Sequence, residues 1–176
     1  LGEDADFDKL IDAAHRRGLR VLLDGVFNHV GTDFPRYRDA VDHQDPDAAK
    51  WFRGRPGRFH TFEGHEGLIT LNHRNPAIAD YTVDVMKHWL GRGADGWRLD
   101  AAYAVPESFW ARVLPRVRGA HPDAWFVAEV IHGDYATFVQ NTTVDSVTQY
   151  ELWKAIWSSL NDGNFHELDW ALQRHN

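Results

Sequence analysis

The chain has 176 residues, of which 43% are hydrophobic and 26% charged, which is typical of a folded protein and excludes disordered and collagen-like chains. Its formal net charge of −7 excludes the basic surface that nucleic acid or an anionic membrane requires. Because there is no Cys, disulfide scaffolds, thiolate-bound zinc and thiol nucleophiles are also excluded. No apolar run approaches the roughly 20 residues of a membrane helix. The lack of Cys does not fix the compartment, and we favour a cytoplasmic location slightly over secretion.

The first third of the chain predicts a helix, a strand and a long loop. The apolar residues within 7–14 follow helical spacing, with Asp6 as a capping candidate and Gly18 placed to end the helix. The apolar run 19–24 predicts a strand that is buried on both faces of a parallel sheet. Residues 30–67 then lose periodicity and gather Gly, Pro, Asp, Arg and His, so we expect a loop excursion there and no helix.

The rest of the chain alternates between strands and helices. The expected elements are, in order, a helix from Asn75-Pro76 to Gly91, a strand at 94–99, a helix at 106–119 interrupted by Pro115, strands at 125–130 and 145–150, and helices near 151–160 and 165–174. Strict alternation of this kind indicates an α/β fold with a parallel sheet.

Three of the apolar strands end on an acidic residue: Asp24, Asp100 and Glu129. In (β/α)-barrels the carboxyl ends of all strands meet at one rim, which carries the active site. Acids also end strands as turn formers or helix caps, and for a single strand that interpretation is the better one. For three strands together, a shared site is favoured.

Arg98 and the residues around Glu129 suggest different roles for two of these acids. Arg98 lies two positions before Asp100, so both side chains point to the same face of the strand. The guanidinium would keep Asp100 ionised, as a nucleophile must be, although a purely structural ion pair is the alternative. The apolar neighbours of Glu129 within 125–131 predict an apolar environment, which suits a proton donor. Such a pair of acids is what retaining glycoside hydrolysis uses.

Four short motifs resemble those of the α-amylase family of glycoside hydrolases. They are DGVFNH (24–29), LITLN (68–72), GWRLDAA (96–102) and the strand that carries Glu129, and they occur in the family order over essentially the whole chain. FW at 109–110 and DSVTQY at 145–150 are most similar to the branch of cyclomaltodextrinase, neopullulanase and maltogenic amylase.

The resemblance implies a partial (β/α)8 TIM barrel that covers about strands 3 to 6. Residues 1–29 and 68–176 would form the barrel part, and residues 30–67 an inserted loop domain. The chain is expected to be a central fragment of the catalytic domain, because the first two strands of the family and its third catalytic carboxylate have no counterpart in the sequence.

The resemblance also assigns roles. It implies that Asp100 is the nucleophile, that Glu129 is the general acid/base and that Arg98 orients the nucleophile. It further implies that His29 binds sugar hydroxyls and that Asp24 supports the rim.

Other positions carry weaker implications. Asn28 matches a calcium ligand of many members, but the branch often lacks the ion, so no cofactor is required and calcium is left open. The segment AAYAVPE (101–107) departs from the VANEVDH usual in the branch, which leaves acceptor specificity open. Tyr103 and His132 are candidate substrate contacts on that side, although an exposed loop histidine explains His132 equally well.

The implied function is a retaining hydrolase or transglycosylase that acts on α-1,4-glucans or maltooligosaccharides by double displacement. A catalytically silent amylase-like domain that binds a partner is the alternative, but such proteins normally lose one of the acids, and both are present here. An unrelated α/β barrel with a carboxylate metal site fits the motif order poorly. Linkage preference, chain-length preference, the balance of hydrolysis and transfer, and the oligomeric state do not follow from the sequence.

Overall fold

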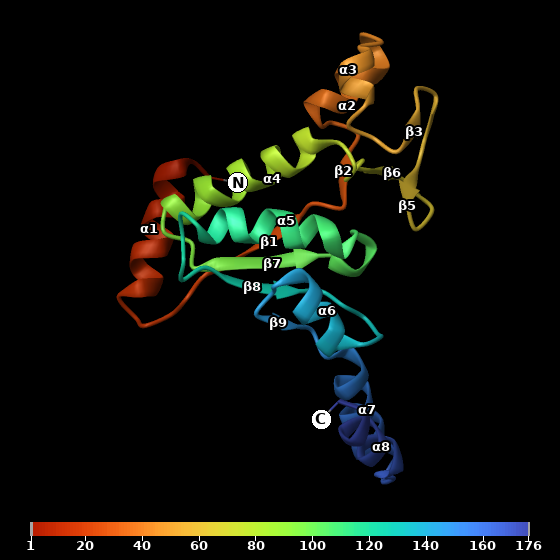
Figure 1. The fold of residues 1–176 in the computed structure, drawn as a ribbon. Coiled ribbons are helices and arrows are strands. Elements are labelled where there is room, and N and C mark those ends of the chain that lie inside the picture. Colours follow the sequence, from red (N-terminus) through yellow and green to blue (C-terminus); the bar gives the residue numbers. More distant parts are fainter. Residues whose placement is uncertain (1, 176) are drawn as a thin grey trace.

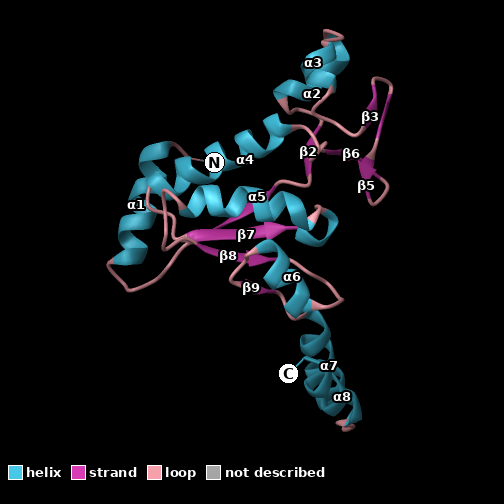
Figure 2. Ribbon diagram, viewed as in Figure 1, coloured by secondary structure: helices cyan, strands magenta, loops and turns pink. Residues whose placement is uncertain are grey.

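The computed structural model describes residues 2–175, which form an α/β fold around a four-stranded parallel sheet (Figures 1 and 2). The strand order is β1-β7-β8-β9, with β1 at Leu22–Val26, β7 at Gly96–Asp100, β8 at Trp125–Ala128 and β9 at Ser146–Val147. All three pairings are parallel. The predicted α/β class with a parallel sheet is confirmed, and β9 is shorter than the strand expected at 145–150.

Helices connect the strands and cover one face of the sheet. The helices outside the 30–67 segment are α1 (Asp4–His15), α4 (Pro76–Gly91), α5 (Glu107–Arg118), α6 (Tyr135–Thr142), α7 (Tyr150–Asp162) and α8 (His166–His175). Figure 1 shows α4 and α5 lying along the sheet, whereas α7 and α8 pack on each other and project away from it. No helix within residues 2–175 is long and apolar enough to cross a membrane.

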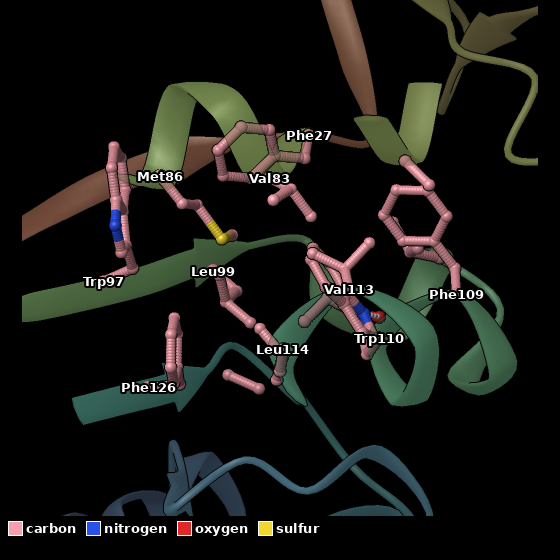
Figure 3. Close-up of a cluster of buried hydrophobic side chains, with 14 of the residues drawn as sticks. Phe27, Val83, Met86, Trp97, Leu99, Phe109, Trp110, Val113, Leu114 and Phe126 are labelled. Atoms are coloured by element: carbon pink, nitrogen blue, oxygen red, sulfur yellow. Dashed lines mark hydrogen bonds between the residues drawn. The ribbon is translucent and has the colours of Figure 1, made fainter. Parts of the chain in front are cut away.

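The core lies between the sheet and the helices α4 and α5 (Figure 3). Trp97 and Leu99 of β7 and Phe126 of β8 point toward the buried residues of α4 and α5, among them Met86 and Trp110. Each fully buried apolar side chain of this size contributes about 1.5–3 kcal/mol relative to an exposed one. This packing fixes β7, which ends at Asp100, and β8, which ends one residue before Glu129.

The other face of the sheet is left open by the described residues. Side chains alternate along a strand, so Arg98 and Asp100 point away from the face that Trp97 and Leu99 present to the helices. On the neighbouring strand, Leu22 and Val26 are 41% and 45% exposed on this open face. The predicted site therefore lies on the uncovered side of the sheet.

The 30–67 segment contains two short helices where we expected only a loop. They are α2 (Pro35–Asp42) and α3 (Pro46–Ala49), and each begins with Pro at its first position, where the missing N–H costs nothing. Asp45 caps α3 by accepting hydrogen bonds from the N–H groups of Asp47 and Ala48 at 2.8 and 3.3 Å. Helices this short bury too few residues to produce a periodic pattern.

Short antiparallel strands complete this segment. β2 (His29–Gly31) pairs with β6 (His65–Thr70), which also pairs with β5 (Thr61–Phe62), and β3 (Gly54–Arg55) pairs with β4 (Arg58–Phe59). The first of these pairings places His29 beside the hairpin β5–β6.

Two element boundaries that involve predicted acidic residues differ from the sequence prediction, and one helix was not predicted. Helix α1 begins at Asp4, so Asp6 lies inside its first turn and accepts the Glu3 N–H at 3.2 Å. Strand β1 runs to Val26, which places Asp24 in its middle and not at its end. Helix α6 was not predicted, although Asp134 caps it by accepting the Thr137 N–H at 3.0 Å.

Candidate active site

The guanidinium of Arg98 brings together three carboxylates, from the middle of β1, the end of β7 and the residue after β8. Its Nη1 donates to Asp24 Oδ1 at 2.6 Å and to Asp100 Oδ1 at 2.8 Å. Its Nη2 lies 2.9 Å from Glu129 Oε1. The three acids that the strand pattern placed at one rim thus surround one cation.

The sheet register explains this arrangement. Asp24 of β1 lies directly beside Arg98 of β7, and Asp100 follows on the same face two residues later. Glu129 comes one residue after β8, and its N–H continues the sheet pairing by donating to the Leu99 carbonyl at 2.9 Å. The backbone hydrogen bonds therefore position the carboxylates before any side-chain contact is made.

Arg98 is held in its charged form. Burial lowers the pKa of its guanidinium, but the hydrogen bonds to Asp24 and Asp100 and the charge of Glu129 outweigh that effect and raise the pKa overall. Arg98 is a fixed positive charge that balances part of the acidic cluster.

The predicted apolar environment of Glu129 is wrong. Besides Arg98, its carboxylate accepts the Ala101 N–H at 2.8 Å and the Tyr150 hydroxyl at 3.1 Å. The apolar neighbours in sequence do not surround the carboxylate, because Phe126 and Ala128 are buried on the other face of the sheet, while Trp125 is 50% exposed.

Ala101 contributes its backbone to the site, which no feature of the sequence indicated. Its φ and ψ are 46° and 37°, in the left-handed region that non-glycine residues occupy at a cost of about 1–2 kcal/mol. This conformation, immediately after Asp100, is the one in which its N–H donates to Glu129. The strained residue thus links the strand of Asp100 to Glu129.

His29 lies against the inserted segment. Its ring is 8% exposed and stacks on Phe62, with ring centroids 4.7 Å apart and an interplanar angle of 14°. Burial lowers the pKa of His29 and outweighs the opposing attraction of the Asp100 and Glu63 carboxylates. The imidazole is therefore neutral at neutral pH, with one ring nitrogen able to donate and one to accept.

Two tyrosines contact acids of the site. The Tyr103 hydroxyl donates to Glu63 Oε1 at 2.7 Å, and burial together with that carboxylate raises the pKa of Tyr103 to about 12. The hydrogen bond from Tyr150 to Glu129 raises the pKa of Tyr150 as well. Glu63 and Tyr150 were missed at the sequence level, because they reach the site from the inserted segment and from the start of α7.

Two predicted positions lie apart from this network. His132 is exposed and makes no hydrogen bond or ion pair with the other described residues, so its contact with substrate stays a prediction. Asn28 is buried, with its Nδ2 3.2 Å from the ring nitrogen Nδ1 of His29. Within residues 2–175 no group of three His, Asp or Glu side chains could hold a metal ion. Calcium at Asn28 also stays a prediction.

Comparison with known proteins identifies the family. The family model described as the alpha-amylase catalytic domain matches residues 1–174. The chain belongs to the alpha-amylase family. Among curated relatives of this amylase-family chain, neopullulanase 2 of Thermoactinomyces vulgaris is 32% identical over 94% of the chain and 30% of its own length. A cyclomaltodextrinase of a Bacillus species is 32% identical over 89% of the chain and 30% of its own length.

Solved structures of relatives have the same fold. The cyclic alpha-maltosyl-(1→6)-maltose hydrolase of Arthrobacter globiformis, solved with its named saccharide, matches with a TM-score of 0.91 and 27% identity over 99% of the chain and 42% of that structure. The branch of neopullulanase, cyclomaltodextrinase and maltogenic amylase, which the motifs indicated, is confirmed. The chain spans about 30% of the length of the curated relatives it matches.

Proposed function

We propose that the intact protein containing this chain is a retaining glycoside hydrolase or transglycosylase that acts on α-1,4-glucans or maltooligosaccharides. The observation that carries the proposal is the Arg98 guanidinium, which holds Asp100 and Glu129 within one hydrogen-bonded cluster. The substrate class rests on relatives named neopullulanase and cyclomaltodextrinase. We also infer that the four parallel strands are the third to sixth of an eight-stranded barrel, with residues 30–67 as an inserted loop domain.

In the first step, the Asp100 carboxylate attacks the anomeric carbon while Glu129 gives its proton to the departing glycosidic oxygen. A covalent glucosyl ester forms on Asp100 and the glycosidic bond breaks. Arg98 orients the Asp100 carboxylate through the 2.8 Å hydrogen bond from its Nη1. His29, neutral and buried, is placed to exchange hydrogen bonds with sugar hydroxyls.

In the second step, Glu129 removes a proton from water or from a sugar hydroxyl, whose oxygen attacks the anomeric carbon and releases Asp100. The contacts of Glu129 with Arg98 and the Ala101 N–H suit the ionised carboxylate that this step needs. Water as acceptor gives hydrolysis, and a sugar hydroxyl gives transfer.

Covalent trapping tests the proposal. A fluorinated α-glucosyl fluoride slows the second step, so the glucosyl ester should accumulate, and peptide mass spectrometry should locate it on Asp100. The Asp100→Asn variant is the control and should form no adduct. If the intact wild-type protein forms no adduct and releases no fluoride, the catalytically silent binding domain becomes the better assignment.

A further inference from the structure

The tip of hairpin β5–β6 contacts the candidate site through two consecutive residues. Phe62 stacks on His29 at 4.7 Å, and the Glu63 carboxylate accepts the Tyr103 hydroxyl at 2.7 Å. His29 begins β2, whereas Tyr103 lies in the short helix η1 (Ala102–Ala104) that follows β7. The hairpin tip therefore connects His29, the candidate sugar-binding residue, to the segment after Asp100.

Glu63 is an unusual residue for the turn that it occupies. Glu63 and Gly64 form the two-residue connection between Phe62 and His65, with φ values of 49° and 80°. A turn with two left-handed residues favours Asn-Gly or Gly-Gly, because other side chains are disfavoured in this conformation. The side chain of this Glu accepts the hydrogen bond from the Tyr103 hydroxyl.

Tyr103 is anchored to the catalytic strands by its backbone. Its N–H donates to the Glu129 carbonyl at 3.2 Å, and it follows Asp100 by three residues. Its side chain is half-buried, whereas Glu63 is exposed. Tyr103 is thus the fixed partner in this contact, and the position of the hairpin tip depends on Tyr103.

We propose that Glu63 and Tyr103 are positioning residues that hold hairpin β5–β6 against the strand of Asp100 and thereby fix His29 for sugar binding. The role in binding rests on the proposed function. Release of Glu63 would free the adjacent Phe62 and, through the stacked rings, the imidazole of His29. The contacts of Arg98 with Asp100 and Glu129 do not involve the hairpin, so the loss should appear in substrate binding more than in bond cleavage.

Kinetics of the intact protein test this separation. We expect Glu63→Ala and Tyr103→Phe each to raise KM for maltooligosaccharides about threefold to tenfold, the size expected for loss of one hydrogen bond of ordinary strength, with a smaller change in kcat. Glu63→Gln keeps a carbonyl acceptor for the Tyr103 hydroxyl and should recover most of the effect. The double variant should be no worse than either single one, because both remove the same contact.

Glu66→Ala is the matched control, since Glu66 lies on the same hairpin, is exposed and pairs with no other described residue. Hydrogen exchange of the backbone amides at 60–68 gives a second readout that does not require activity. Exchange should be faster in Tyr103→Phe and unchanged in Glu66→Ala. An intact protein without glycosidase activity would refute the proposed function. Faster exchange in Tyr103→Phe than in Glu66→Ala would still support the positioning contact. Additive effects in the double variant, or exchange in Tyr103→Phe that matches Glu66→Ala, would overturn it.

Discussion

At the scale of single residues, the site depends on the shape of one guanidinium. Arg98 uses Nη1 for Asp24 and Asp100 and Nη2 for Glu129, so its planar group binds carboxylates in fixed directions. A lysine ammonium is a compact charge on a flexible chain and cannot reproduce this geometry. We expect Arg98→Lys in the intact protein to lower kcat/KM by at least about tenfold to a hundredfold, the cost of misplacing reacting groups. Steady-state kinetics on maltotriose measures the loss, and near-normal turnover would exclude the orienting role of Arg98.

The roles of the two acids can be separated by the leaving group of the substrate. We expect Asp100→Asn and Glu129→Gln each to lower turnover of maltooligosaccharides by roughly a hundredfold or more, because they remove the proposed nucleophile and the proposed proton donor. An aryl glucoside with a good leaving group needs little protonation, so Glu129→Gln should retain much of its first step on that substrate and Asp100→Asn should not. Burst kinetics of aryl release provides the measurement. Equal losses of both variants on both substrates would contradict the assignment.

His73 should make stability depend on pH. Burial lowers its pKa from 6.5 and outweighs the hydrogen bond that its Nε2–H donates to the Phe27 carbonyl at 2.9 Å, while Arg53 and Arg112 lower it further. Because the unfolded chain takes up the proton first, this contribution to stability is complete above pH 6.5 and is lost as the pH falls toward the lowered pKa. As the pH falls below about 6.5, the free energy of unfolding should decrease by at most about 1.4 kcal/mol per pH unit from this group. Urea unfolding at several pH values tests this prediction. The free energy of unfolding should depend less steeply on pH in His73→Gln than in the wild-type protein, and identical slopes in the two proteins would contradict the prediction.

At the scale of elements, the close approach of β7 to β8 requires glycine at position 96. A Cβ on Gly96 would lie 2.0 Å from the Trp125 carbonyl oxygen and 2.8 Å from Leu22 Cδ2, both far below contact distance. We expect Gly96→Ala to destabilise the intact protein by about 1–3 kcal/mol or more, and to lower activity because Arg98 follows two residues later on the same strand. Urea midpoints provide the test. Gly91→Ala is the control, since its Cβ would meet nothing within 4 Å, and an equal effect of both substitutions would argue against the strand contact.

The elements also show what a sequence can predict about this site. Asp100 and Arg98 could be paired from their spacing because side-chain alternation is a local property of strands, and the three acids could be placed at one rim because parallel strands share a direction. Ala101 could not be found, since its role is a backbone conformation that its side chain does not encode. The polar environment of Glu129 could not be predicted, because Tyr150 reaches its carboxylate from α7. The position of α7 depends on tertiary packing. The helices α2 and α3 were not predicted, because they are too short to show a periodic pattern of apolar residues.

For the molecule as a whole, the described residues expose large apolar side chains at several places, two of which bear on folding. One is the face of β1, where Leu22 and Val26 are 41% and 45% exposed beside the acidic cluster. The other is the pair α7 and α8, which projects from the sheet in Figure 1 and exposes Trp153 by 63%, Leu160 by 71% and Trp170 by 57%. Large apolar side chains that are exposed together on one element are normally covered by other parts of a chain or by another molecule.

We therefore predict that residues 1–176 expressed alone have no glycosidase activity and do not form a stable monomer. The strands β1 and β9 form unpaired edges of the described sheet, and an open edge next to exposed apolar side chains favours self-association. Catalysis should fail separately, because the open face around Asp100 and Glu129 lacks the surrounding groups that stabilise a positively charged transition state, an effect of several kcal/mol. Light scattering and aryl-glucoside hydrolysis on the purified segment test the two halves. A cooperatively melting monomer would refute the first, and turnover that disappears in Asp100→Asn would refute the second.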